Sequence, residues 1–449
     1  MTRLLAWLLN ALYLIAIFVT LPWLVWSAVK HGKYREGFAA KLWGQVPQRL
    51  GGRPCVWLHA VSVGEVNLLS TVIDALKSSR PEWEYVISTT TKTGYELAQK
   101  KYVGHTVFYC PLDFSWATQR AMRRMRPALL LLAELELWPN LIQSARSHGA
   151  RIAIVNGRLS DSSMRGYRRL RPLVARVLRQ VDLIAAQNKE TADRFLQLGA
   201  KRISVHTTGS LKFDGAQTDR RNGRTCALAE LAGLAAGDVV LLAGSTRSPE
   251  EAYAISIYQK LLQEYPRLKL VLVPRHPQRF DEVADLLKQS GLAWTRRSKL
   301  ESHGSAIRNY GSAIRNSHSV ILIDTVGELS AWWGLATVGF VGGSFGSRGG
   351  QNMLEPAAYG VATCFGPNTR NFRDIVSQLL AADGAKVVND RDGFEQFVRH
   401  VLEDPEWAEQ LGKNARALVL AQQGATQRTV EMLLPLVKAD TDAPRLSAA

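Results

Sequence analysis

Glu65 stands where a carboxylate could act as a base. It ends the run His59–Glu65 (HAVSVGE), which follows a strand-like apolar run and opens a helical stretch over 65–78. A carboxylate at the carboxyl end of a strand can take a proton from an attacking hydroxyl when the two come within hydrogen-bond distance. Acids are also favoured in the first turn of a helix, where they offset the helix dipole. The sequence leaves both roles open.

A pair of acids follows another buried run. The segment LLLLAELELWPN carries Glu134 and Glu136 just before Trp138, Pro139 and Asn140. On a strand, two carboxylates two residues apart point to the same side. Burying such acids costs free energy unless a partner or a reaction uses them. The pattern indicates an acidic site at this strand end, and a salt bridge to a neighbouring arginine is the alternative.

A glycine-rich loop in the second half has the composition of an anion site. It lies between apolar runs at 337–341 and 361–365, and Asn352 opens a helical turn that holds Leu354 and Glu355. The loop glycines are Gly342, Gly343, Gly346, Gly349 and Gly350. Residues without side chains let backbone N–H groups approach a phosphate, and a helix N-terminus adds positive charge. With Glu355 accepting bonds from sugar hydroxyls, the stretch predicts a nucleotide-sugar pocket; a plain connecting loop is the alternative.

Other polar residues follow strand-like runs in the same way. Lys212, in TGSLKFD, could neutralise a departing phosphate or carboxylate, or form a hinge salt bridge instead. Gly244, Ser245 and Thr246 repeat the pattern of small residues before a helix that begins near a proline. The remaining strand-end groups are Pro274-Arg275-His276 and Val326-Gly327-Glu328. Together these groups predict one ligand site.

The alternation of apolar runs with helical stretches predicts an α/β fold with parallel sheets. The runs are 55–61, 85–91, 106–110, 128–135, 151–156, 182–187, 239–244, 268–274, 319–325, 336–342 and 361–366. A polar, glycine-bearing segment at 214–226 predicts a linker between domains at 31–213 and 227–438. Two such domains place ligands in a cleft between them, outside the carboxyl ends of the strands.

The first thirty residues predict a membrane anchor. Residues 4–29 carry no charge, and Lys30, Lys33, Arg35 and Lys41 follow. A helix of this length covers about 39 Å, enough to cross an apolar core of about 30 Å. The positive-inside tendency puts the body in the cytoplasm. A cleaved signal peptide and a helix lying in the interface are the alternatives.

Net charge and residue composition indicate which kinds of partner the protein can bind. The net charge of +17 predicts a polyanionic partner or surface. Between residues 151 and 179 there are eight arginines and one acid, which suits anionic lipid as surface or as substrate. No nucleic-acid-binding module is recognisable. Four scattered cysteines and the isolated Asp390-Arg391-Asp392 do not predict a metal site.

Two further segments have no assigned function. GSAIRN occurs at 304–309 and again at 311–316, which indicates a tandem duplication in a loop. The tail at 439–449 is predicted to be disordered.

Seven motifs taken together resemble the bacterial 3-deoxy-D-manno-octulosonic acid (Kdo) transferases, which act on lipid A precursors. The motifs are WLHAVSVGEV, AELELWPN, GSLKFD, AGSTRSPEE, VPRHP, DTVGEL and GGQNMLEPAAYG. They occur in this order from residue 57 to residue 360, so the resemblance covers most of the chain. Each motif is short, but the set is specific. Ser210, Arg247 and Gln351-Asn352-Met353 depart from the residues usual in the family.

The resemblance implies a GT-B fold of two Rossmann-like domains facing a cleft, with an N-terminal membrane-anchor helix at the cell inner membrane. It implies an inverting transfer of Kdo from CMP-Kdo to a lipid A precursor, with no metal and no cofactor. Glu65 matches the family's proton acceptor, and Glu136 and Lys212 match its transition-state stabilisers. The matching CMP contacts are Pro274, Arg275, Val326, Gly327, Glu328, Asn352, Met353, Leu354 and Glu355. Gly244, Ser245, Thr246, Gly349 and Gly350 are further candidate donor-loop residues.

Two other functions are compatible with the residues. One is a GT-B transferase that uses another nucleotide sugar, and the other is a non-catalytic, membrane-bound binder of nucleotides or polyanions. The three glutamates argue against the binder, because a pure anion site would avoid them. The number of Kdo residues transferred, the acyl pattern of the acceptor and the oligomeric state are not determined by the sequence.

Overall fold

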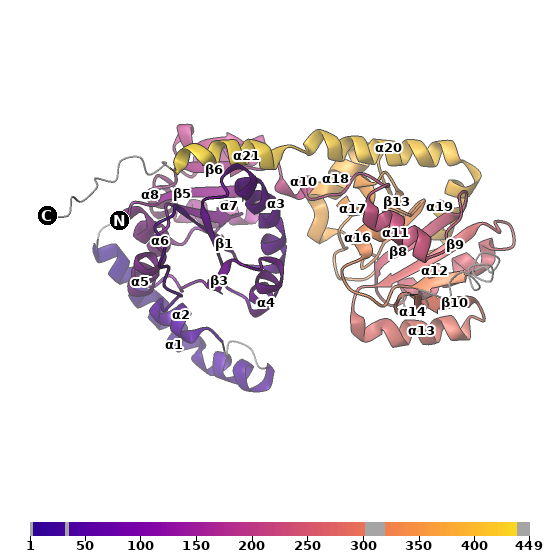
Figure 1. Ribbon diagram of the computed structural model, residues 1–449, viewed down its shortest axis with the longest axis horizontal. Helices are drawn as coiled ribbons and strands as arrows, with labels where there is room; N and C mark the ends of the chain where they lie inside the picture. The colour runs from indigo at the N-terminus through magenta and orange to yellow at the C-terminus, as the bar shows by residue number, and fades with distance from the viewer. Residues whose placement is uncertain (1–2, 32–35, 301–318, 438–449) are drawn as a thin grey trace. The chain divides into compact units, whose positions relative to one another are not determined.

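The computed structural model describes residues 3–31, 36–300 and 319–437. The chain divides into two compact units, shown in Figure 1. Unit 1 comprises Met1–Gly215 and Gln423–Ala449, and unit 2 comprises Ala216–Gln422. The GSAIRN duplication and the tail at 439–449 lie outside the described residues.

Unit 1 is built on a parallel seven-stranded sheet in the order β3-β2-β1-β4-β5-β6-β7. The strands are β1 (Cys55–Ala60), β2 (Glu84–Thr89), β3 (Thr106–Tyr109), β4 (Leu129–Ala133), β5 (Arg151–Gly157), β6 (Leu183–Ala186) and β7 (Val205–Thr207). The strand order reverses at β1 and β4, which pair in register from Val56 with Leu129. Such a reversal leaves space for a ligand outside the carboxyl ends of the two strands.

Helices cover both faces of this sheet, which explains why β1 and β4 are buried at every position and, apart from His59, apolar. One core cluster packs α3 and α21 against the sheet, and another packs α5, α6, α8 and α9 against the opposite face. The helices of unit 1 beyond the N-terminal pair are α3 (Val63–Ser79), α4 (Lys92–Lys101), α5 (Ser115–Met125), α6 (Pro139–Ser147), α7 (Asp161–Arg169), α8 (Arg171–Leu178), α9 (Lys189–Gln197), α10 (Leu211–Asp214) and α21 (Ala425–Leu433), with 3₁₀ turns η1 (Arg202–Ser204) and η5 (Leu434–Leu436).

The N-terminal apolar segment forms one long helix, α1 (Arg3–His31), which lies beside α5 and is followed by α2 (Phe38–Trp43) (Figure 1). Its stretch Leu4–Trp23 has a mean hydropathy of 2.3 and is 11% buried. Among the described residues, this is the one helix whose length and composition suit a membrane span. A signal sequence has the same properties, so the helix by itself does not establish an anchor.

Unit 2 is built on a second parallel seven-stranded sheet, in the order β10-β11-β9-β8-β12-β13-β14. Its strands are β8 (Val239–Thr246), β9 (Leu268–Pro274), β10 (Ala293–Arg296), β11 (Ser319–Leu322), β12 (Val338–Val341), β13 (Ala362–Phe365) and β14 (Lys386–Val387). Here the order reverses at β8 and β12, so this pair marks the expected ligand position of the second sheet.

The helices of unit 2 include α12, α13, α19 and α20, which pack against one face of the sheet in one large core cluster. They are α11 (Gly223–Leu231), α12 (Glu250–Leu261), α13 (Phe280–Gln289), α14 (Arg297–Leu300), α16 (Leu329–Trp333), α17 (Leu354–Ala358), α18 (Arg373–Ala381), α19 (Arg391–Glu403) and α20 (Pro405–Gln422), with 3₁₀ turns η2 (Pro277–Arg279) and η4 (Arg370–Phe372).

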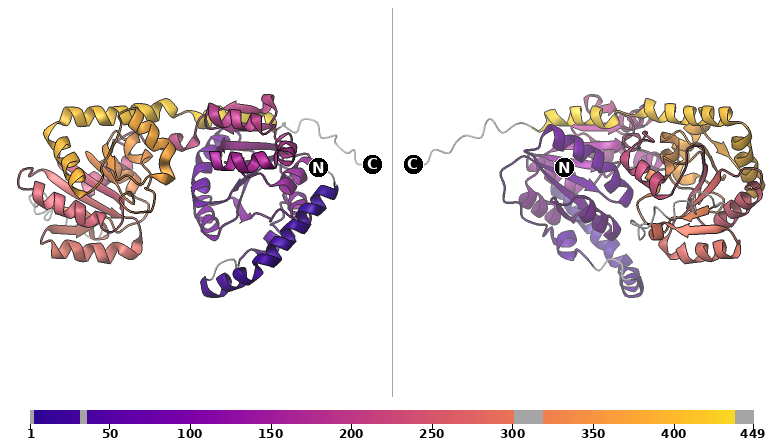
Figure 2. Two further views of the ribbon diagram at one scale, coloured as in Figure 1. Left: turned by 180° about the vertical axis from the view of Figure 1, so that it is seen from behind. Right: turned by 45° about the vertical axis from the view of Figure 1, so that its right-hand side comes forward.

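The chain returns to unit 1 at Gln423, whereas the sequence predicts a second domain that continues to residue 438. The backbone N–H groups of Gly424 and Thr426 donate to the Asp214 carboxylate, so the end of α10 caps α21. The buried Val430 and Leu433 then complete the cluster under α3. Figures 1 and 2 both show α21 with the strands of unit 1 and α20 with those of unit 2. A helical pattern alone does not say which sheet the helix covers.

A backbone contact between α20 and the turn after α17 yields the first prediction. A Cβ atom at Gly412 would come within 3.0 Å of the Gly360 carbonyl oxygen. We expect Gly412→Ala to lower the free energy of unfolding by roughly 1–3 kcal/mol, because the two backbones must separate. Urea denaturation measures the change. Gly223→Ala is the control, since a Cβ atom there meets open space; equal stability of the two variants would contradict the prediction.

Candidate active site

Glu65 lies in the first turn of α3 and bonds the N-cap residue, Ser62, and the residue before it. Its Oε2 accepts the Val61 backbone N–H at 2.8 Å, and its Oε1 accepts the Ser62 hydroxyl at 2.8 Å. The Ser62 hydroxyl oxygen in turn accepts the Glu65 N–H at 3.4 Å, which completes a reciprocal capping arrangement. The capping role that the sequence left open is therefore present. It holds the carboxylate at the carboxyl end of β1.

Burial raises the pKa of Glu65, and the charge of Glu134 raises it further, while the hydrogen bonds from Val61 and Ser62 oppose the shift. A higher pKa makes a carboxylate a stronger base toward a hydroxyl proton. Capping and proton transfer are compatible, because each carboxylate oxygen has a second lone pair.

Glu134 and Glu136 lie beyond the strand, because β4 ends at Ala133. The prediction that both acids project from one strand face is therefore wrong. Glu134 has φ of 56°, a left-handed conformation that non-glycine residues rarely adopt. This turn of the backbone ends the extended geometry, so residue spacing no longer fixes the side on which each carboxylate lies.

The acids nevertheless lie close enough to interact. Burial raises the pKa of Glu136 to about 7, and the charges of Glu65 and Glu134 add to the rise. The Trp138 indole N–H donates to Glu136 Oε2 at 2.7 Å and opposes the shift. Like charges held near one another in a poorly solvated position are typical of functional sites.

Lys212 reaches the same cluster from α10. Its Nζ lies 3.5 Å from Glu134 Oε1, and both side chains are partly exposed. Asn156, at the end of β5, positions α10: its Oδ1 accepts the Leu211 N–H at 3.0 Å and the Ser210 hydroxyl at 3.3 Å. The structure thus brings the three predicted catalytic residues to one edge of unit 1, with Glu134 between them as an ion-pair partner.

The glycine loop of unit 2 binds a carboxylate of the protein itself. Glu250, 1% exposed at the start of α12, accepts four backbone N–H groups. The donors are Arg247, Gly343, Ser344 and Phe345, at 2.7 to 3.2 Å. The first turn of the loop is therefore an anion site, as its composition indicates, but its anion is Glu250. Nothing in the sequence pattern indicates this role, although Glu250 lies in the AGSTRSPEE motif.

Four arginines lie near one another and near His276 at this loop. Burial lowers the pKa of Arg247, and the charges of Arg348 and Arg275 lower it further. Arg247 Nη2 lies 2.6 Å from His276 Nε2, and His276 has a pKa lowered by burial and by the same arginines, including Arg279. Arg279 is paired with Glu251 and Glu282, whereas Arg247, Arg275 and Arg348 repel one another. Repelling cations of this kind attract anionic groups. Arg348 was not predicted, because its position between loop glycines gives no periodic signal.

Arg275 also approaches Glu355, the acid predicted to contact the donor. Burial raises the pKa of Glu355, whereas a hydrogen bond from Asn352 at 2.9 Å and the charge of Arg275 lower it. Met353 and Pro274 are buried. The helix that follows, α17, is only five residues long.

Residues 326–328, which are predicted to contact the donor, follow β11 and differ in exposure. Val326 is 80% exposed, and Gly327 next to it has φ of 95°. The Glu328 carboxylate pairs with the buried Arg297 at 2.8 and 3.0 Å and accepts the Thr325 hydroxyl. Glu328 therefore fixes the loop, and Val326 and Gly327 form its exposed surface.

The candidate donor-loop residues lie where the loop after β8 and the loop after β12 approach each other. A Cβ atom at Gly342 would come within 3.0 Å of Thr246 and Glu250. Ser245, Gly349 and Gly350 all have φ between 55° and 89°, the region that favours glycine. The β8 and β12 ends thus approach more closely than side chains would allow.

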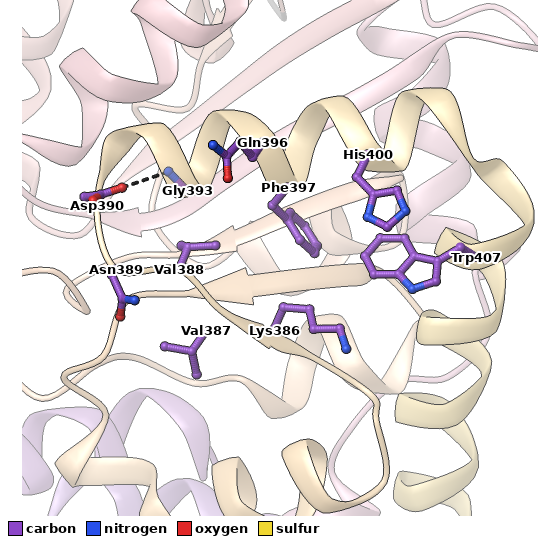
Figure 3. Close-up of a pocket in the computed structure, with 10 residues that line it drawn as sticks. All are labelled: Lys386, Val387, Val388, Asn389, Asp390, Gly393, Gln396, Phe397, His400 and Trp407. Atoms are coloured by element: carbon purple, nitrogen blue, oxygen red, sulfur yellow. Dashed lines mark hydrogen bonds between the residues drawn. The ribbon is translucent and has the colours of Figure 1, made fainter.

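A separate pocket of about 640 Å³ lies at the outer edge of the unit 2 sheet. Figure 3 shows His400 stacked on Trp407, with Lys386 below the indole. None of the predicted site residues lines it. Asp390, from the discounted metal motif, instead caps α19 by accepting the Gly393 N–H. Within the described parts of the chain, no group of three or more metal-ligating side chains could hold an ion.

The fold defines the class of protein. Two parallel Rossmann-like sheets of this kind are the GT-B type of α/β architecture. The solved UDP-GlcNAc 2-epimerase of Neisseria meningitidis bound to UDP-GlcNAc matches 85% of this chain and 100% of its own, with a TM-score of 0.55. At 12% identity this likeness concerns the fold alone.

The family follows from sequence. A family profile described as 3-deoxy-D-manno-octulosonic-acid transferase (kdotransferase) matches residues 33–215. The 3-deoxy-D-manno-octulosonic acid transferase of Bordetella pertussis is 35% identical over 92% of this chain and 94% of its own. The solved C-terminal CMP-Kdo binding domain of WaaA from Acinetobacter baumannii is 32% identical over 44% of this chain and 96% of its own, with a TM-score of 0.39. The chain belongs to the Kdo transferases and is a glycosyltransferase.

The raised pKa of Glu136 predicts a pH-dependent stability. A carboxyl whose pKa rises from 4.5 to about 7 on folding holds its proton more tightly in the folded state, so folding stability falls as pH rises through this window. Glu136→Gln removes the free-energy cost of a buried negative charge and keeps an acceptor for the Trp138 indole N–H. We expect it to raise the free energy of unfolding by roughly 1–2 kcal/mol at pH 8 and little at pH 4, allowing for solvent screening.

Chemical denaturation at the two pH values measures the difference. Glu96→Gln, an exposed acid of the same unit, serves as the control and should shift stability equally at both. A Glu136→Gln variant that is destabilised to the same degree at pH 4 and pH 8 would contradict the assigned cause.

Proposed function

We propose that this transferase moves Kdo from CMP-Kdo to a lipid A precursor, with inversion at the anomeric carbon, in lipopolysaccharide core synthesis. The observation that carries the proposal is the cluster of Glu65, Glu134, Glu136 and Lys212 at the strand-order reversal of unit 1. A site of this composition suits proton removal from a neutral sugar hydroxyl. It does not suit the binding of an anion alone.

Glu65 is the proposed base. The acceptor hydroxyl oxygen attacks the anomeric carbon of Kdo, its proton passes to Glu65, and the bond from that carbon to the phosphate oxygen breaks. CMP leaves with the bonding electron pair. Burial and the neighbouring Glu134 raise the pKa of Glu65, which favours proton capture. The positions of Glu136 and Lys212 in the same cluster support their roles in stabilising the charges that develop.

The donor is proposed to bind unit 2. CMP-Kdo carries a phosphate and a sugar carboxylate, both anionic, and the cluster of Arg247, Arg275 and Arg348 offers fixed positive charge. Glu250 already fills the first turn of the glycine loop, so the donor phosphate is assigned to the arginines. Fixed cations of this kind can perform the electrostatic work of a metal ion, which supports a metal-independent reaction.

The membrane is the proposed location of the acceptor. Helix α1 exposes large apolar side chains along most of its length, and Phe38 and Trp43 of α2 are also exposed. Helix α7 has no buried residue and carries Arg165, Arg168 and Arg169. Exposed apolar side chains on α1 and exposed arginines on α7, in the same unit, suit a bilayer surface with anionic headgroups. We assign the protein to the inner membrane, with its body on the cytoplasmic side.

The assignment of the base is tested by Glu65→Gln. The amide retains the shape and can still cap α3, because glutamine is accepted in such capping positions, but it cannot take the proton. We expect turnover to fall by roughly 10²–10⁴-fold with an unchanged circular dichroism spectrum and melting temperature. Glu96→Gln is the matched control and should retain full turnover. A Glu65→Gln enzyme with near-normal turnover refutes the assignment.

The donor is tested by product release and competition. With CMP-Kdo and a lipid A precursor in detergent, the enzyme should release CMP, and added CMP should inhibit more strongly than UDP. Chelation with EDTA should leave the rate unchanged if fixed arginine charge replaces a metal. Stronger inhibition by UDP would favour another nucleotide sugar, and a rate lost to EDTA and restored by Mg²⁺ would contradict metal independence.

A further inference from the structure

Two polar side chains of the apolar helix α1 face the protein. Trp7 and Phe18 are 68% and 77% exposed, whereas Asn10 is 2% exposed. Tyr13 lies one turn further along the same face, and its ring packs edge-on against Phe114 at 6.0 Å. A buried amide needs hydrogen-bond partners, so its presence in such a helix calls for an explanation.

Asn10 caps a helix of the body. Its Oδ1 accepts the Ser115 N–H at 3.0 Å, and its Nδ2 donates to the Ser115 hydroxyl at 2.8 Å. Ser115 is the first residue of α5, whose own N-cap, Phe114, has no side chain that could accept this bond. Helix α1 therefore supplies the cap that α5 lacks.

Tyr13 bonds a carboxylate that caps the neighbouring helix. Its hydroxyl donates to Asp113 Oδ2 at 3.0 Å. Asp113, 4% exposed, also accepts the backbone N–H groups of Asn140 at 3.1 Å and Leu141 at 2.8 Å. These are N–H groups of the first turn of α6, which has no cap of its own because Trp138 precedes it. The Asn140 side chain completes the link, with its Nδ2 3.4 Å from Asn10 Oδ1.

The start of α6 is also the end of the acidic loop. Trp138 immediately precedes α6, and its backbone N–H and indole N–H both donate to Glu136, at 3.1 and 2.7 Å. Hydrogen bonds therefore run from α1 through Asp113 to the first turn of α6, and the backbone from Asn140 back to Trp138 connects them to the bonds on Glu136.

We propose that Tyr13 and Asn10 are positioning residues, through which the docked helix α1 holds the Glu134–Trp138 loop in its working geometry. The proposal rests on the proposed function in that it takes Glu136 to act in the transfer. Apolar side chains would attach α1 to the body without the desolvation cost of buried polar groups. Polar contacts instead fix a single register and angle of the helix, which is what a positioning contact requires.

The test compares Tyr13→Phe with Phe18→Leu in the full-length protein in detergent. Tyr13→Phe removes one hydroxyl and keeps the ring against Phe114, whereas Phe18→Leu alters an exposed position of the same helix. Hydrogen exchange followed by mass spectrometry reports the amides of Asn140 and Leu141 directly. We expect their exchange to accelerate about three- to tenfold in Tyr13→Phe and to stay unchanged in Phe18→Leu.

Kinetics supply the second measurement. In Tyr13→Phe, kcat should fall by about three- to tenfold while KM for CMP-Kdo stays within about twofold, because a displaced Glu136 affects the transition state and not donor binding. Combining Tyr13→Phe with Asp113→Asn should give a non-additive loss.

Unchanged exchange in Tyr13→Phe would overturn the link between α1 and α6. Faster exchange with unchanged kcat would overturn the positioning role, since the loop would move without consequence. If the unsubstituted protein fails to release CMP from CMP-Kdo, the proposed function fails instead, and the exchange measurement still decides whether α1 controls the start of α6.

Discussion

Both units hold like charges close together at the carboxyl edge of their sheet. This electrostatic repulsion is the constraint that the surrounding structure must offset. Unit 1 gathers Glu65, Glu134 and Glu136, and unit 2 gathers Arg247, Arg275 and Arg348. Each grouping opposes folding, because burial and repulsion both disfavour the charged forms. Such groups persist where a ligand or a reaction uses them. An acidic site that accepts a proton and a basic site that binds anions are the two requirements for transferring an acidic sugar from a nucleotide to a hydroxyl.

The backbone around these charges is held by carboxylates that bind N–H groups. Glu65 binds the Val61 N–H before α3, Asp113 caps α6, and Glu250 binds the turn of the glycine loop. A loop or helix start that leaves N–H groups unpaired in a buried place costs free energy. Each carboxylate meets this need and fixes a loop that carries functional side chains. The structural and chemical roles of these acids are therefore combined, and a single substitution can affect both.

The chain belongs to the Kdo transferases. Its structure shows in addition which hydrogen bonds and ion pairs position the residues of the candidate site. Departures from the family's usual residues lie within the observed networks: Ser210 donates to Asn156, and Arg247 lies against His276. The apolar helix α1 is part of unit 1 and not a detached tether, because Asn10 and Tyr13 bond the body. The docking of α1 and the start of α6, next to the acidic loop, are thereby physically connected.

The sequence by itself determined the α/β class, most strand positions and the motifs that carry the family, because apolar periodicity and glycine placement are local properties. It also indicated the acids at the ends of β1 and β4. Only the tertiary structure decided that β4 stops at Ala133, that Glu250 fills the glycine loop, and that α21 belongs to unit 1. The left-handed turn at Glu134, the N–H groups bound by Glu250 and the sheet covered by α21 all depend on partners distant in the chain. The periodicity of a sequence does not indicate such partners, because they are brought together only when the helices and strands pack.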